Sequence, residues 1–197
     1  ALIGGGSDKN PAPQTPSSMT ITSPAFKDGE FIPPNYTCDG RDVSPPLTIE
    51  GVPIIAGRIP GTLSLALIVD DPDAPSGTLR PGSGQAWVHW VLYNMSPTVQ
   101  FILENSITPG AFQPIKGSPG PTSLPMAEQG RTSFGGKTGY GGPCPPSGTH
   151  RYFFKVYALD TIFKFNEPPS AAELEQAMAG HILDQAQLMG RYARIKI

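Results

Sequence analysis

The chain has 197 residues and a formal net charge of −2, and its 14 Lys and Arg nearly balance its 16 Asp and Glu. This balance gives no support for a broad basic surface that would bind nucleic acid or an anionic membrane. With 23 Gly, 24 Pro and only 15% charged residues, the composition is typical of a loop-rich globular domain and not of a helical bundle. No run of roughly 18 apolar residues occurs, so no segment is predicted to span a membrane.

Residues 1–18 are mostly Gly, Pro, Ser and other polar residues. They predict a flexible N-terminal tail or linker, followed by a single domain over residues 19–197. The segment lacks the apolar core of a signal peptide. Because a spacer of this kind suits an exported protein whose signal has been removed, a periplasmic or extracellular location is slightly favoured over the cytoplasm.

The remaining chain is predicted to consist mainly of short strands. Apolar or alternating runs bounded by turn residues predict strands at 19–26, 45–49, 63–69, 87–93 and 151–159. The third and fourth runs are expected to pair as antiparallel neighbours. Residues 110–147 are loop-like, and a loop of this length inside a compact domain indicates a functional role. Because strands and helices do not alternate, the pattern favours a sandwich over a parallel sheet.

Residues 170–191 change character. Ser170 and Glu173 fit a capping box, and apolar residues follow at helical spacing. Gly180 is expected to divide this segment into two helices. Residues 194–197, RIKI, predict a last short strand. The fold class predicted from the residues is therefore mainly β, with C-terminal helices.

Two acids follow directly after the strand at 63–69, in the sequence Asp71-Pro72-Asp73-Ala74-Pro75. The prolines fix φ and remove backbone donors, so this corner is expected to be rigid. Asp71 and Asp73 then lie at the rim of a sheet. Considered alone, each acid is explained as a turn residue that accepts hydrogen bonds from its own backbone.

Three further polar residues adjoin predicted strands: His89, His150 and Tyr152. Considered alone, each is explained by packing in or beside the sheet. If the strand at 151–159 joins the same sheet, imidazoles and carboxylates gather at one end, and the carboxylates keep the imidazoles protonated. Together with a Tyr hydroxyl and backbone N–H groups from Gly141 and Gly142, these residues predict an anion site.

Two hydrolase alternatives use the same residues. Two His and two Asp are suitable metal ligands, but no HxH, HExxH or CxxC spacing is present. Cys144 with His150 is a conceivable nucleophile pair. However, Pro143 and Pro145 flank Cys144, and no helix N-terminus is expected there to lower the pKa of its thiol.

The two cysteines, Cys38 and Cys144, are most simply two separate reduced thiols. A disulfide between them, closing a long loop, is the alternative. Two cysteines alone do not decide the redox compartment.

Several long motifs resemble the phosphatidylethanolamine-binding protein family, also called the Raf kinase inhibitor protein family, and in particular its prokaryotic branch. In chain order they are SPAFKDGEFIPPNYTCDGRDVSPPL, LALIVDDPDAP, WVHWVLYN, GYGGPCPPSGTHRYFFKVYALD and GHILDQAQLMGRYAR. The resemblance covers residues 20–194. It implies an antiparallel β-sandwich in which a large central sheet packs on a smaller one, with α-helices from the C-terminal part at one side.

The resemblance also implies a small pocket for phosphate or a phosphoethanolamine head group, without catalysis and without a cofactor. The positions that match the motifs of this pocket, or lie beside them, are Asp71, Asp73, Pro75, Trp87, His89, Tyr140, Gly142, Cys144, Pro146, His150 and Tyr152. A protein partner such as a kinase or a protease, and a homodimer, are further expectations from the family. The hypothesis is therefore a non-enzymatic anion-binding protein, possessing no nucleic-acid site and no transmembrane segment.

Overall fold

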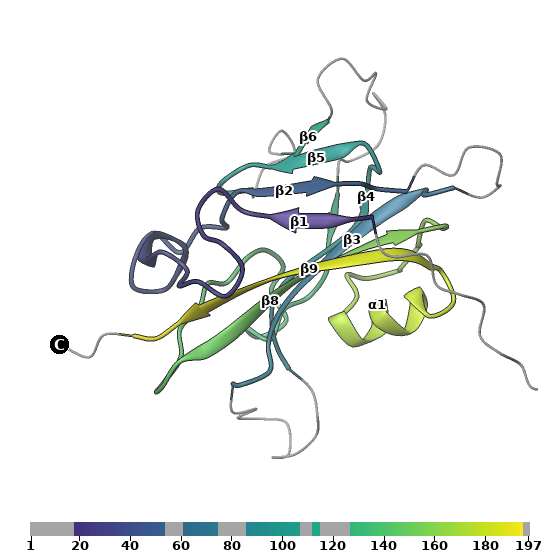
Figure 1. The fold of residues 1–197 in the computed structure, drawn as a ribbon. Helices are drawn as coiled ribbons and strands as arrows, with labels where there is room; N and C mark the ends of the chain where they lie inside the picture. Colours follow the sequence, from purple (N-terminus) through teal and green to yellow (C-terminus); the bar gives the residue numbers. More distant parts are fainter. Residues whose placement is uncertain (1–17, 54–60, 75–85, 107–111, 115–126, 195–197) are drawn as a thin grey trace, which may run out of the picture.

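The computed structural model of the chain describes residues 18–53, 61–74, 86–106, 112–114 and 127–194. Within them, two antiparallel sheets face each other, and the helix α1 lies against the outer face of the larger sheet (Figure 1). Among the described residues, no helix is both long and apolar enough to cross a membrane.

The smaller sheet contains, in spatial order, β1 (Thr20–Thr22), β2 (Leu47–Glu50), β5 (Val99–Ile102) and β6 (Phe112–Pro114). The larger sheet contains β7 (Glu128–Gln129), β4 (Trp87–Met95), β3 (Ser64–Asp71), β8 (His150–Leu159) and β9 (Ile182–Tyr192). A short 3-10 turn, η1 (Pro34–Tyr36), precedes β2, and α1 (Ala171–Met178) connects β8 to β9.

Strand β3 is buried along its whole length because both of its faces are covered. Leu65, Leu67 and Val69 pack in the core between the two sheets. Ala66 and Ile68 point to the other face and pack in a second cluster with α1. Burial on both faces explains why the segment is a continuous apolar run instead of an alternating one.

The predicted sandwich is confirmed, as is the pairing of its central strands. β3 pairs antiparallel with β4, and on its other side with β8, so the strand predicted at 151–159 does join the same sheet. The capping box is also present: the Ser170 hydroxyl accepts from the Glu173 N–H, and the Glu173 carboxylate accepts from the Ser170 N–H. The predicted tail lies outside the described residues apart from Ser18.

The second predicted helix is wrong, because the chain after Gly180 forms strand β9. Gly180 has a φ of +84°, which ends the helical turn at a residue without a Cβ. β9 then pairs with β8 over its length. Its buried residues, Leu188, Gly190 and Tyr192, alternate with a period of two. Pairing with the long free edge of β8 therefore overrides the helical spacing of the apolar residues. Arg194 follows the strand without joining one, and the rest of the predicted strand at 194–197 lies outside the described residues.

Candidate functional site

A pocket of about 210 Å³ opens where β3, β4 and β8 end at one side of the larger sheet. Its lining comes from these strand ends, from the corner after β3 and from two loops, namely from Asp71, Ala74, Trp87, His89, Phe134, Cys144, Pro145, Pro146, His150 and Tyr152.

Asp71 holds the corner of the pocket together, and its side chain is almost completely buried. Its Oδ1 accepts the backbone N–H groups of Asp73 and Ala74 at 2.8 and 2.9 Å. Its Oδ2 accepts from Nδ1 of His150 at 2.7 Å. One carboxylate thus fixes the turn after β3 and the ring orientation of a histidine on β8, which leaves the histidine Nε2 for another partner.

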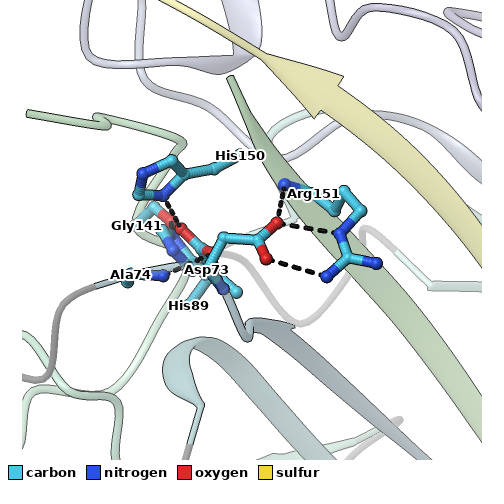
Figure 2. Close-up of polar contacts among 7 residues, drawn as sticks. Asp73, Ala74, His89, Gly141, His150 and Arg151 are labelled. Atoms are coloured by element: carbon cyan, nitrogen blue, oxygen red, sulfur yellow. Dashed lines mark hydrogen bonds and ion pairs between the residues drawn. The ribbon is translucent and has the colours of Figure 1, made fainter. Parts of the chain in front are cut away.

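Asp73 has a different role, because it is turned toward Arg151 (Figure 2). The Arg151 backbone N–H and both ends of its guanidinium donate to the Asp73 carboxylate at 2.8 to 2.9 Å. These hydrogen bonds lower the pKa of Asp73. Asp73 does not line the pocket. It braces the outer side of the corner instead.

His89 reaches the pocket through a β-bulge in β4. Val69 pairs with Trp90 and Asp70 pairs with Val88, so His89 is the extra residue between two ladder positions. A bulge breaks the alternation of side chains and re-aims the inserted one. As a result His89 and Trp90 both lie on the inner side of the sheet, His89 in the pocket and Trp90 in the core.

Two hydrogen bonds tie His89 to Gly141. The Gly141 N–H donates to the His89 carbonyl at 2.9 Å, and Nδ1 of His89 donates to the Gly141 carbonyl at 2.6 Å. Since a carbonyl can only accept, Nδ1 carries the proton. Burial lowers the pKa of His89, and the Gly141 hydrogen bond and the Asp71 charge oppose this shift without cancelling it. The expectation that nearby carboxylates keep the imidazoles protonated is therefore wrong for His89, whose Nε2 presents a lone pair at neutral pH.

Tyr152 stands between the two histidines, and it is 1% exposed. Its ring meets the edge of His89 at 5.2 Å between centroids and lies nearly parallel to His150 at 6.5 Å. Its hydroxyl is buried and makes no hydrogen bond of normal length to a described residue, although the Asp71 carboxylate lies nearby. Burial, followed by the nearby Asp71 charge, raises the pKa of this hydroxyl, so it stays protonated. It is a buried donor close to the Asp71 carboxylate, and it can turn toward an acceptor in the pocket.

The loop that precedes β8 forms one wall of the pocket and is attached to the loop around η1. The Tyr140 hydroxyl donates to the Tyr36 carbonyl at 2.8 Å, and the Gly142 N–H donates to Asp42 at 2.7 Å. Neither Tyr140 nor Gly142 lines the pocket. The amides of Gly141 and Gly142 are both engaged within the protein, so the expectation that they are free for an anion is wrong.

A disulfide joins Cys38 to Cys144 within the same pair of loops. The prediction of two separate thiols is therefore wrong, and the alternative is confirmed. The Cys38 N–H also donates to the Pro143 carbonyl at 3.1 Å. The bonded sulfur of Cys144 cannot serve as a thiolate nucleophile, which removes the Cys/His version of the hydrolase alternative. No group of three or more His, Cys, Asp or Glu in the described part of the chain is placed to hold a metal ion.

Most of the candidate residues gather in the pocket, although some do not. The pocket contains Asp71, Trp87, His89, Cys144, Pro146, His150 and Tyr152, whereas Asp73, Tyr140 and Gly142 support it from outside. Pro75 lies outside the described residues. Ala74, Phe134 and Pro145 also line the pocket, although they are not among the residues predicted from the sequence. Phe134 packs edge-on against Trp87 and His89, but it lies in a loop whose sequence has no periodicity to indicate this position.

The lowered pKa of His89 predicts a loss of stability on mild acidification. In the unfolded chain this histidine takes up a proton near pH 6.5, whereas in the folded protein it does so only at lower pH. The unfolded state therefore binds more protons below this pH, and the free energy of unfolding should fall by up to about 1.4 kcal/mol per pH unit from this group. Urea unfolding between pH 7.5 and 5.5 measures the slope. The variant His89→Gln should have a shallower slope, and equal slopes would contradict the assignment.

The sequence model of the family described as phosphatidylethanolamine-binding protein matches residues 22–193. A UPF0098 protein of Methanothermobacter thermautotrophicus is 42% identical over 89% of this chain and 99% of its own length. The crystal structure of a phosphatidylethanolamine-binding protein homologue from Chlamydia trachomatis has a TM-score of 0.72 at 37% identity, covering 91% of this chain and 99% of that one. Escherichia coli YbcL, described as a member of the mammalian family, has a TM-score of 0.70 at 32% identity, covering 91% and 100%. This chain therefore belongs to the phosphatidylethanolamine-binding protein family.

Proposed function

We propose that the pocket binds a small anion of the phosphate type, such as phosphate or a phosphoethanolamine head group, and that the protein acts by binding rather than by catalysis. The observation that carries this proposal is the buried hydroxyl of Tyr152, which stands between two histidines and makes no hydrogen bond of normal length to a described residue. Nδ1 of both histidines is already engaged, at Gly141 and at Asp71. The Tyr152 hydroxyl and the Nε2 atoms of the two histidines are therefore polar groups that this lining offers to a ligand.

The size of the pocket favours a head group over a whole lipid. Its volume of about 210 Å³ lies below the roughly 300–1,000 Å³ that is typical of sites for drug-sized molecules. A phosphate with a short substituent fits this volume, and acyl chains do not. Trp87, Phe134 and Pro146 form the apolar part of the lining, which keeps water away from the polar groups.

Proton uptake should accompany binding, because Nε2 of neutral His89 offers a lone pair instead of a donor. An anion placed beside this ring stabilises the imidazolium form and so raises its pKa in the complex. The complex then holds a proton that the free protein lacks. Affinity for an anion should accordingly increase as the pH falls, by at most about tenfold per pH unit for one proton.

The variant His89→Ala tests the proposal. A hydrogen bond to an ionised group contributes about 1.5–3 kcal/mol, so the dissociation constant for phosphate should rise roughly tenfold to hundredfold. Isothermal titration calorimetry measures this change. The matched control is His181→Ala, because His181 is exposed and pairs with Asp160 away from the pocket. An unchanged affinity in His89→Ala would refute the role assigned to this residue.

The proton uptake is measured separately with sulfate, a dianion that does not itself titrate between pH 5 and 9. We expect sulfate affinity to increase from pH 8 to pH 6 in the unaltered protein. His89→Gln should lose most of this dependence. The same pH dependence in both proteins would show that the proton is taken up elsewhere.

We further propose that the protein works in an oxidising compartment, which supports the periplasmic or extracellular location over the cytoplasm. The two cysteines of the chain are bonded to each other. Disulfides persist mainly outside the reducing cytosol. Rapid alkylation of thiols in intact cells of the source organism, followed by mass measurement, tests this. Two alkylated cysteines would contradict it.

A further inference from the structure

A second groove lies on the opposite face of the larger sheet, beside the first turns of α1. Its volume is about 830 Å³. Neighbouring residues of one strand point to opposite faces. Asp71 and Tyr152 accordingly line the anion pocket, whereas Asp70 and Phe153 line the groove. The groove is thus a separate site on the same strand ends.

A buried carboxylate forms the floor of this groove. Asp70 is 5% exposed, and its Oδ2 accepts from Nζ of Lys155 at 2.6 Å. Its Oδ1 is buried and has no hydrogen-bond partner in the part of the chain that the structure describes. Burial of a carboxylate oxygen without a hydrogen-bond donor is unfavourable in free energy. The Oδ1 of Asp70 therefore indicates a position for a further hydrogen-bond donor.

A second carboxylate, Glu175, reaches the groove from α1. Lys155 lies close enough to both acids to lower their pKa values, but burial outweighs it and raises the pKa of each. Arg131, the other cation that lines the groove, is bonded to Glu173 at 2.8 Å. Among the described groove residues, Lys155 is thus the cation nearest two carboxylates, the buried Asp70, with which it is paired, and the solvent-exposed Glu175.

The rest of the lining suits an apolar chain that carries a positive charge. Phe153 and Val88 provide a half-buried apolar surface beside Asp70. The Lys155 ammonium lies 6.0 Å from the centre of the Phe153 ring, which shows that an ammonium on an alkyl stem fits here. The Lys155 side chain is 29% exposed and covers Asp70, so a ligand reaches Oδ1 once this side chain shifts.

We propose that this groove binds a primary ammonium group carried on a short alkyl chain, with the ammonium donating to Asp70 and Glu175 and the chain lying on Phe153. The ligand is either a free alkylamine or the side chain of a lysine in another protein, since both present the same group. The site is independent of the anion pocket.

The test uses the full chain and n-propylammonium chloride as the probe, followed by two-dimensional NMR of backbone amides. We expect chemical-shift changes at Phe153 and Gln187, and none of comparable size with propionate, propanol or sodium chloride.

Glu175→Gln should weaken binding of propylammonium about tenfold, as expected for the loss of one charge-assisted hydrogen bond. The control Glu50→Gln, an exposed acid on β2, should have no effect. Equal responses to propylammonium and sodium chloride, or equal affinities in the two variants, would overturn the proposal.

Lys155→Ala offers a second and independent test that leaves the Asp70 carboxylate in place but removes its ammonium partner. It removes a propylammonium group from the groove, so the added probe should bind about tenfold more tightly and should restore part of the lost thermal stability. Failure of the probe to raise the melting temperature of this variant more than that of the unaltered protein would also overturn the proposal.

A short peptide with one lysine, compared with its acetyl-lysine form, distinguishes a protein lysine from a free alkylamine as the natural ligand. Tighter binding than propylammonium indicates a protein lysine, and weaker binding indicates a free amine.

Discussion

Reduction of the Cys38–Cys144 disulfide should lower the free energy of unfolding by about 4 kcal/mol. The bond joins residues that are 106 positions apart, and closing a loop of about 100 residues removes roughly 4.7 kcal/mol of chain entropy from the unfolded state. Measured values are usually somewhat smaller than this limit. Urea unfolding with and without reductant measures the difference from the free energies extrapolated to zero urea, because the released crosslink expands the unfolded state and changes the slope as well.

The double variant Cys38→Ser/Cys144→Ser is the control for this experiment. It should unfold at the same urea concentration as the reduced protein, and reductant should not change it further. Because these are the two cysteines of the chain, no other thiol can contribute. A reduced protein as stable as the oxidised one would show that the hydrogen bonds between the two loops, such as the one from Gly142 to Asp42, suffice to hold them together.

The strands of the core could be predicted from sequence because their patterns depend on local burial. β3 is buried on both faces and is a continuous apolar run, whereas β8 alternates between buried and half-exposed residues. The Asp-Pro-Asp-Ala-Pro sequence likewise predicted a fixed corner, and Asp71 does cap it. The long motifs of the family then indicated which of the polar residues near these strands belong to one pocket.

The structural predictions that are wrong share one cause: contacts with a segment distant in the sequence determine the local structure. Residues 182–192 have helical spacing of apolar side chains, yet the edge of β8 makes them a strand. This strand also needs a glycine at 190, where a Cβ would lie about 2.5 Å from the Ile32 side chain. Helical periodicity carries no information about such a partner.

The pocket contains two more features that no local pattern reveals. The bulge at His89 depends on the register between β3 and β4, and the sequence of β4 alone does not indicate it. The Gly142 amide faces Asp42 because the disulfided loops bring together residues 100 positions apart. A Cβ at Gly142 would lie 2.6 Å from the Tyr36 carbonyl oxygen, so this glycine serves close backbone packing and not ligand binding.

Replacement of Asp71 by Ala should destabilise the protein by about 3–5 kcal/mol. The substitution leaves two backbone N–H groups of the corner and Nδ1 of the buried His150 without their common acceptor. The side chains of this pair are 3% and 8% exposed, so water replaces the lost contacts poorly. Removal of one partner from a buried ion pair or hydrogen-bonded network typically has a cost of this size. Urea unfolding at pH 7 measures it.

Asp73→Ala is the matched control, because it removes a carboxylate two residues away that is bonded to an exposed arginine. The Asp73 and Arg151 side chains are 29% and 51% exposed, and exposed ion pairs contribute about 0–1 kcal/mol. The free energies of unfolding of Asp71→Ala and Asp73→Ala should therefore differ by at least about 2 kcal/mol. In a double-mutant cycle, Asp71→Ala and His150→Ala should also be strongly non-additive, by about 1–3 kcal/mol, since each removes the other's partner. Additive effects, or equal losses for Asp71→Ala and Asp73→Ala, would show that the buried carboxylate does not organise this pocket.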